Sequence, residues 1–124
     1  IGQRREIALK YTEAFSKCEY LIPPFQENDR ESAWHLYMIR LRPEKLKKNR
    51  RQIFDELRAQ GIGVHVHYIP LHLLRFYRQK YGHKRGDFPV AEAYYDSALT
   101  LPLFPSLTEG DVDRVIRSVL ETCR

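Results

Sequence analysis

The sequence predicts an α+β fold in which a small sheet, of about three mainly antiparallel strands, packs against helices. Apolar residues recur at spacings of three and four in several segments, which is typical of helices that bury one face. Between these segments lie short runs rich in β-branched and aromatic residues, which are typical of strands. The length of 124 residues suits a single domain with a modest core.

The N-terminal segment is expected to be a helix over residues 3–18. Its apolar stripe consists of Ile7, Ala8, Tyr11, Ala14, Phe15 and Cys18. Pro23-Pro24 and the polar residues 26–32 then predict a loop. Residues 33–41 follow as a predicted strand whose two faces are both apolar, which favours a central strand or one covered on both sides.

Capping signals bracket the next helix. Asn49, with Gln52 three residues later, is a capping box at its start, and Gly61 stands where a helix C-terminus needs a positive φ. Residues 62–68 are then expected to form a strand that Pro70 closes.

The C-terminal half is expected to hold three more helices and one short extended run. Residues 73–81 predict a helical piece, and Asp87 is expected to cap a helix that has Pro89 in its first turn. The expected buried face of that helix is Val90, Ala91, Tyr94, Tyr95 and Ala98. Residues 99–104 contain a proline and are expected to be an edge strand or irregular. Thr108, with Asp111 three positions later, caps the last predicted helix.

Basic residues outnumber acidic ones, and the formal net charge is +5. Part of this excess forms a cluster of Lys45, Lys47, Lys48, Arg50 and Arg51. Such a cluster could follow the phosphates of a nucleic acid, but no aromatic residue is interleaved with it. We therefore interpret it as a solvated surface that leads into a helix, although a positive field could still attract a small phosphorylated ligand.

Cysteine usage and hydropathy indicate the compartment. Cys18 and Cys123 lie far apart and form no C-x-x-C pattern, which argues against a disulfide framework or a thiolate zinc site and suits a reducing environment. No apolar run approaches the roughly 20 residues that span a bilayer. A soluble, cytoplasmic protein is expected.

The most informative stretch runs from Gly61 to His72. Side chains alternate along a strand, so His65 and His67 are expected on one face, and Tyr68 on the other. Imidazoles grouped at the end of a strand usually face a cleft, a metal ion or a satisfied polar pocket. A zinc site of His65, His67 and His72 is one alternative, but no carboxylate or thiolate lies near them in sequence.

Several motifs resemble the DegT/DnrJ/EryC1/StrS family of aminotransferases, in the order and spacing found there. The stretch Gly61-Ile-Gly-Val-His-Val-His-Tyr-Ile-Pro-Leu-His72 is similar to a signature in the C-terminal part of these enzymes. Further similar segments are Arg4–Ala8 with Tyr11, Trp34–Tyr37, Gly86–Tyr95 and Leu101–Ile116. Within the family the chain most resembles transaminases that aminate C4 of a UDP-linked 4-keto-6-deoxy-N-acetylhexosamine, the pseudaminic acid pathway type.

The resemblance implies the fold of the C-terminal small domain of a fold-type I aminotransferase. Residues 1–18 would end the helix that connects to a large N-terminal domain absent from this chain, and residues 19–124 would form the small domain. The parent enzyme would be a homodimer that uses pyridoxal 5′-phosphate to move an amino group, from glutamate, to a nucleotide-linked 4-keto-6-deoxy sugar. The family's Schiff-base lysine lies in the large domain, so this chain is expected to hold no catalytic or cofactor-binding residue and to be inactive alone.

The resemblance also suggests where substrate is bound. His67 and Tyr68 are expected to donate hydrogen bonds to the sugar or its phosphates, while Pro70 holds the turn and His72 supports them. These histidines could instead bond backbone groups at an interface between domains. Another alternative is a non-catalytic interaction or regulatory module, since a domain without its partner exposes apolar faces.

Overall fold

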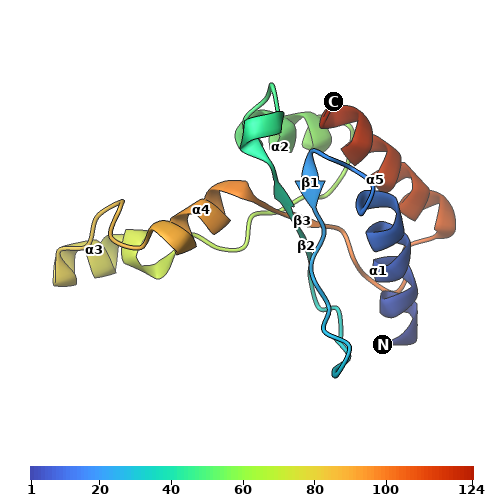
Figure 1. The fold of residues 1–124 in the computed structure, drawn as a ribbon, viewed down its shortest axis with the longest axis horizontal. Coiled ribbons are helices and arrows are strands. Elements are labelled where there is room, and N and C mark those ends of the chain that lie inside the picture. The colour runs from blue at the N-terminus through green and yellow to red at the C-terminus, as the bar shows by residue number, and fades with distance from the viewer.

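The computed structural model covers residues 1–124 and shows a small antiparallel sheet packed against helices, which confirms the predicted fold class (Figure 1). The sheet order is β1-β2-β3, with strands β1 (Leu21–Ile22), β2 (Tyr37–Leu41) and β3 (Ala98–Leu101). The helices are α1 (Gly2–Phe15), α2 (Arg50–Ala59), α3 (Arg75–Tyr81), α4 (Pro89–Ser97) and α5 (Glu109–Thr122). Two 3₁₀ turns cover Pro43–Lys45 and Leu71–Leu73. None of these helices is both long and apolar enough to cross a membrane.

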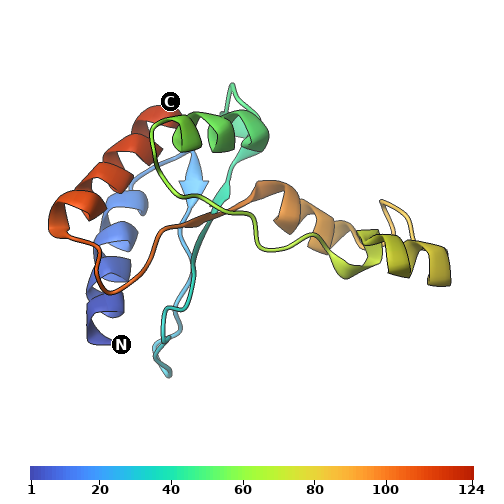
Figure 2. The same cartoon turned by 180° about the vertical axis from the view of Figure 1, so that it is seen from behind.

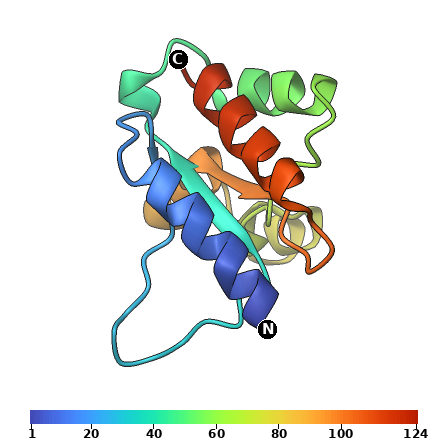
Figure 3. The ribbon, with the colours of Figure 1, turned by 90° about the vertical axis from the view of Figure 1, so that its right-hand side faces the viewer.

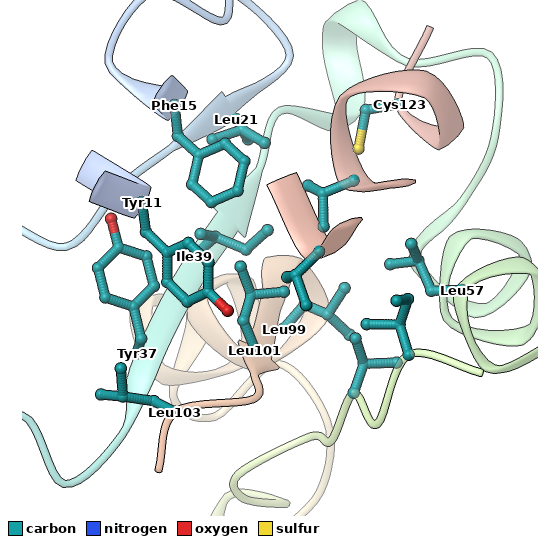
Figure 4. Packing of buried hydrophobic residues seen from close by; sticks show 14 of the residues in the cluster. Tyr11, Phe15, Leu21, Tyr37, Ile39, Leu57, Leu99, Leu101, Leu103 and Cys123 are labelled. Carbon is teal, nitrogen blue, oxygen red and sulfur yellow. The ribbon is translucent and has the colours of Figure 1, made fainter. Parts of the chain in front are cut away.

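The core lies between the sheet and the layer formed by α1, α5 and α2. Helix α5 packs beside both α1 and α2, and Figure 3 shows α1 and α5 running across the sheet. Alternate residues of β2 point into this core, because successive side chains of a strand face opposite ways. Figure 4 shows the packed side chains, which include Tyr11, Phe15, Leu21, Tyr37, Ile39, Leu57, Leu99, Leu101, Leu103 and Cys123.

Residues 68–97, which we call the arm, project away from this body (Figures 1 and 2). The arm contains the second 3₁₀ turn, α3 and α4, and it meets the body where α4 contacts β2. At its base the Arg50 guanidinium donates to the Tyr95 carbonyl oxygen at 2.6 Å and lies 4.6 Å from the centroid of the Tyr95 ring. The arm therefore leaves the body at a defined place and carries its own surface.

Both predicted capping boxes are confirmed. The Asn49 side chain accepts from the Gln52 N–H at the start of α2, and Thr108 accepts from Asp111 in the same way at the start of α5. Gly61 follows α2 with φ of 78°, the left-handed conformation that a helix end demands. The predicted central position of the strand within 33–41 is confirmed as well, although β2 is shorter than that range.

The predicted strand over residues 62–68 is wrong. His65 alone pairs with the outer edge of β3, through two backbone hydrogen bonds with Thr100 of 3.0 and 2.8 Å. β3 is short and is followed by Pro102, which has no N–H to offer, so the edge has few further partners. β3 was expected to be an edge strand or irregular, and it is one of the two edge strands of the sheet.

The expected cap of α4 is also wrong, and its expected buried face is right only in part: Ala98 is buried and Tyr95 half-buried, but the other three residues are exposed. Phe88 occupies the N-cap position, whereas the Asp87 carboxylate accepts from the Lys84 N–H at 3.0 Å. Val90 is 84% exposed and Tyr94 is 43% exposed, because α4 lies on the arm and the body covers little of it. A helical pattern of apolar residues shows that a face exists, but not that this chain covers it.

Candidate functional site

Two hollows meet at the segment that carries the histidines. The first, which we call the inner cleft, has a volume of about 570 Å³ and lies between residues 61–67, residues 100–104 and the start of α5. The second, which we call the apolar hollow, has a volume of about 710 Å³ and lies between residues 67–70 and α4. Both volumes fall in the range of small-molecule sites.

His67 lines both hollows. Its Nδ1 is 2.9 Å from the Thr100 hydroxyl on β3, so the ring is held from behind. The His65 ring lies 5.7 Å away and lines the inner cleft as well, as does His35 from the loop before β2. Because Thr100 engages Nδ1, the Nε2 atom of His67 is the ring nitrogen left to meet a ligand, and it donates when Nδ1 accepts.

Tyr68 stands next to His67 and is 75% exposed. The two rings pack edge to face with centroids 4.7 Å apart. Tyr68 lines the apolar hollow together with Pro70, Phe88 and Tyr94. This arrangement offers a phenolic hydroxyl and aromatic faces, which suit the hydroxyls and the apolar face of a sugar.

His72 lies elsewhere, buried in the arm at 7% exposure and outside both hollows. Its Nε2 is 2.8 Å from Oε1 of Glu92, which is also buried. The Glu92 carboxylate accepts further hydrogen bonds from the N–H groups of Gly86 and Phe88. His72 thus ties the loop before α4 in place, and Phe88 on that loop forms a wall of the apolar hollow.

The charge of Glu92 follows from these contacts. Burial raises the pKa of a carboxyl, but the hydrogen bonds from His72, Gly86 and Phe88 outweigh it, and the pKa of Glu92 lies below its ordinary value. The carboxylate therefore stays ionised at neutral pH. It holds its donors in place and does not supply a proton.

The sequence did not indicate three polar residues of the inner cleft. These are His35, Thr100 and Arg114. The Arg114 guanidinium donates to the Gln60 carbonyl oxygen at 2.6 Å and so joins α5 to the end of α2. Two of these residues could have been predicted from the sequence. His35 belongs to one of the recognised motifs, and Thr100 is a polar residue within an apolar run.

The alternative of a zinc site finds no ligand set. No group of three His, Cys, Asp or Glu residues lies in metal-binding positions. His65 and His67 are neighbours at the inner cleft, but His72 is committed to Glu92 in the arm. The three imidazoles therefore do not converge on one point.

The lysines do not fit covalent attachment of pyridoxal phosphate, which requires a lysine aimed into a site that lowers its pKa. No lysine lines either hollow. Lys10, Lys45 and Lys48 form ion pairs with Glu109, Glu19 and Glu56, and the other four, which are Lys17, Lys47, Lys80 and Lys84, are exposed. The side chains that this chain brings to the hollows can bind and orient a ligand.

Comparison with known proteins places this fold and motif order in a family. The model of the DegT/DnrJ/EryC1/StrS aminotransferase family matches residues 1–120. The chain is 41% identical over 118 residues to the spore coat polysaccharide biosynthesis protein SpsC of Bacillus subtilis. The aligned region covers 94% of this chain and 30% of SpsC.

Solved structures agree with the sequence match. PseC of Helicobacter pylori, an aminotransferase involved in the biosynthesis of pseudoaminic acid, is 28% identical with a TM-score of 0.88, covering 98% of this chain and 32% of PseC. The sugar aminotransferase Spr1654 of Streptococcus pneumoniae, in its PLP form, is 30% identical with a TM-score of 0.88, covering 98% and 31%. This chain spans about 30% of the length of the curated relatives it matches. The chain belongs to the DegT/DnrJ/EryC1/StrS aminotransferase family.

Proposed function

We propose that this chain is the C-terminal part of a pyridoxal-phosphate-dependent aminotransferase that transfers an amino group from glutamate to a nucleotide-linked 4-keto-6-deoxy sugar. Residues 1–18 would lead in from a large domain, and residues 19–124 would be the small domain of a homodimeric enzyme. The names of SpsC and PseC support a role in surface polysaccharide or glycan biosynthesis, and PseC favours the pseudaminic acid type. The two free thiols suit the cytoplasm.

The observation that carries this proposal is the position of His67 between the two hollows, with Thr100 holding its ring. In this proposal Nε2 of His67 and the Tyr68 hydroxyl donate hydrogen bonds to oxygens of the sugar nucleotide. The aromatic walls of the apolar hollow pack against its apolar parts. His72 acts through Glu92 and Phe88, by holding the wall that the substrate meets.

The cofactor, when bound in the complete enzyme, supplies the electron sink for moving the amino group. The lysine that anchors it would come from the large domain, so the chain of 124 residues alone is expected to be inactive. After borohydride reduction in the presence of pyridoxal phosphate, no lysine of this chain should carry a stoichiometric pyridoxyl group. A pyridoxyl adduct on any lysine, with matching transaminase activity, would refute this.

A chimera tests the positive part of the proposal. This chain replaces the matching C-terminal segment of SpsC, to which it is 41% identical, and the amino transfer is followed by cofactor absorbance with a UDP-linked 4-keto-6-deoxy sugar. We expect activity, and we expect His67→Ala and Tyr68→Phe to lower kcat/KM by about tenfold or more each, since each removes one hydrogen bond made to the substrate.

The matched control is Tyr20→Phe, which removes a tyrosine hydroxyl remote from both hollows. Cofactor absorbance of each chimera shows whether its large domain is intact. If His67→Ala and Tyr68→Phe chimeras that bind the cofactor keep the parent kcat/KM, substrate contact at this site is refuted.

A second candidate is a non-catalytic interaction module, which the exposed arm favours. Tyr68, Phe88, Val90 and Tyr94 expose a contiguous apolar wall along the hollow. Analytical ultracentrifugation of this chain over a range of concentrations would show self-association if that wall pairs with a second copy. A monomer that becomes active only when joined to a large domain would favour the enzyme over the module.

A further inference from the structure

Arg4, in the first turn of α1, reaches three backbone carbonyl groups beside the inner cleft. Its Nη1 atom donates to the carbonyl oxygens of Trp34, His35 and Leu103, at 3.1, 3.2 and 3.2 Å. The first two residues belong to the loop before β2, and Leu103 follows β3. Since His35 and Leu103 both line the inner cleft, one guanidinium ties two segments of the cleft to the start of α1 (Figure 3).

The turn that Arg4 holds is strained. Trp34 has a φ of 49° and is the one residue other than glycine with a positive φ. Such a conformation is unfavourable for a bulky side chain and persists only where surrounding contacts hold it. The Trp34 N–H donates to the Ser32 hydroxyl at 3.0 Å, and its ring packs against that of Tyr37 with centroids 5.5 Å apart. The bond from Arg4 to its carbonyl oxygen is the third contact, and the turn sets the direction of the next residue, His35.

Arg4 is the only residue of α1 whose side chain bonds to the backbone of this turn. Tyr11 lies seven positions later on the same face of the helix, and its hydroxyl donates to the Pro102 carbonyl oxygen at 2.9 Å. Pro102 also lines the inner cleft. The segment after β3 is therefore held from α1 by two side chains, whereas the carbonyl groups of Trp34 and His35 accept from the Arg4 side chain alone. Arg4 has no acidic partner, so these carbonyl groups and that of Leu103 are its whole set of acceptors.

The residue that Arg4 places has a free imidazole. His35 is exposed and lines the inner cleft, and its ring forms no hydrogen bond within the chain. In contrast, Nδ1 of His67 in the same cleft is engaged by Thr100. Both ring nitrogens of His35 can therefore meet a ligand, one as a donor and the other as an acceptor in the neutral ring. A ligand that reaches Nε2 of His67 from the inner cleft shares that space with the ring of His35.

We propose that Arg4 is a positioning residue of the aminotransferase: it holds the backbone of residues 34–35 and so places the His35 imidazole in the inner cleft, where that ring contacts the sugar nucleotide. This inference deepens the proposed function, on which it rests. Arg4 lines neither the inner cleft nor the apolar hollow, so it acts through His35 and does not touch the substrate.

The kinetic test uses the SpsC chimera and measures kcat and KM for the UDP-linked 4-keto-6-deoxy sugar. Arg4→Met removes the three hydrogen bonds and keeps an unbranched side chain, and His35→Ala removes the imidazole. Each should raise KM by about fivefold or more with little change in kcat, because a hydrogen bond to the bound substrate is lost. The double variant should resemble His35→Ala, since Arg4 acts through that ring, whereas independent losses would multiply.

Arg5→Met is the matched control. Arg5 follows Arg4 directly and pairs with Glu31 on the same loop, but both side chains are exposed. The loss of an exposed ion pair costs little, so the Arg5→Met chimera should keep the parent kcat and KM.

Fluorescence gives a second measurement that does not depend on activity. Trp34 is the only tryptophan of the chain, so its emission reports directly on the turn that Arg4 holds. In the chain of 124 residues, Arg4→Met should shift the emission to the red and increase its quenching by acrylamide, while Arg5→Met should leave both unchanged.

The outcomes separate this inference from the proposed function. Trp34 emission that is equal in Arg4→Met and the parent chain would show that Arg4 does not hold the turn and would overturn the inference. An active chimera whose KM is unchanged by His35→Ala, or in which the losses from Arg4→Met and His35→Ala multiply, would overturn it as well and would leave the proposed function standing. A parent chimera that binds the cofactor but transfers no amino group would refute the proposed function and, with it, this inference.

Discussion

Nε2 of His72 lies 2.8 Å from Oε1 of Glu92, and both side chains are buried inside the arm. The two residues are 20 positions apart and belong to the 3₁₀ turn before α3 and to α4. The same carboxylate accepts from two backbone N–H groups of the loop between those helices. One buried carboxylate therefore joins three segments of the arm.

Glu92→Gln should loosen the loop over residues 83–88. The amide keeps the size of the side chain, but it loses the charge that strengthens the hydrogen bonds from His72 and Gly86. Amide hydrogen exchange at Gly86 and Phe88 should become faster in the variant. Because the pKa of Glu92 lies below its ordinary value, the stabilisation by the carboxylate is present at neutral pH and is lost as the pH falls below the ordinary carboxyl range.

Glu121→Gln is the matched control for this change. Glu121 is exposed on α5 and forms no side-chain bond, so the same loss of charge should leave exchange in the arm unchanged. His72→Phe should resemble Glu92→Gln, since it keeps a ring against Phe88 but removes Nε2. Unchanged exchange at Gly86 in both arm variants would show that the buried pair does not hold the loop.

The base of the arm depends on Arg50. Its guanidinium donates to the Tyr95 carbonyl oxygen, an acceptor left open near the end of α4, and it also covers the Tyr95 ring. Arg50→Ala should lower the free energy of unfolding by about 1–2 kcal/mol, from one charge-assisted hydrogen bond and one cation–π contact. Amides of α4 should exchange faster as well.

Arg51→Ala provides the comparison for Arg50. Arg51 follows it directly in α2 but is exposed and pairs only with Asp55 on the same helix. Urea unfolding of this variant should match the parent chain closely. If Arg51→Ala destabilises the chain as much as Arg50→Ala, the effect belongs to α2 and not to the contact with the arm.

The sequence predicted best those features that depend on near neighbours. Both capping boxes need only two residues three positions apart, and Gly61 needs only the end of its own helix. The apolar stripes of the first and last helices also follow from local spacing. The observed bounds of the helices differ from the predicted ones, because single hydrogen bonds determine where a helix ends. Helix α1, for example, ends at Phe15 rather than at residue 18.

The features that the sequence did not predict depend on distant segments. Residues 62–68 have the composition of a strand, but strand formation needs a partner edge, and β3 offers one to His65 alone. Val90, Ala91 and Tyr94 of α4 were expected to be buried, but the arm has no layer over them. The sequence alone does not distinguish His72 from His67. Only the fold shows that His72 is buried against Glu92, whereas His67 lines the hollows.

Alkaline pH should destabilise the fold. Burial raises the pKa of the Cys123 thiol to about 12, and burial also raises the pKa of Tyr37 to about 12. In the unfolded chain these groups ionise nearer their ordinary values, so the unfolded state binds fewer protons between about pH 9 and pH 12. The free energy of unfolding should therefore fall as the pH rises through that window, by on the order of 1.4 kcal/mol for each pKa unit.

Urea titrations at pH 8, 9, 10 and 11 measure this effect. Cys123→Ala removes one of the titrating groups, so its curve should fall less steeply than that of the parent chain. Tyr81→Phe is the control, because Tyr81 is exposed on the arm and lies outside the core that buries Cys123. Parallel curves for the parent chain and Cys123→Ala would refute the assignment to this thiol.

Leu99 on β3 tests whether the small sheet anchors the core. It is fully buried, pairs in register with Ile39 of the central strand and faces the helix layer. Leu99→Ala should lower the free energy of unfolding by about 2–5 kcal/mol, since it loses buried apolar contacts and leaves a cavity. Leu9→Ala, on the exposed side of α1, should change it by less than about 0.5 kcal/mol. Similar losses in the two variants would mean that the buried side chain of Leu99 stabilises the fold no more than an exposed leucine does, and would refute its role as an anchor of the core.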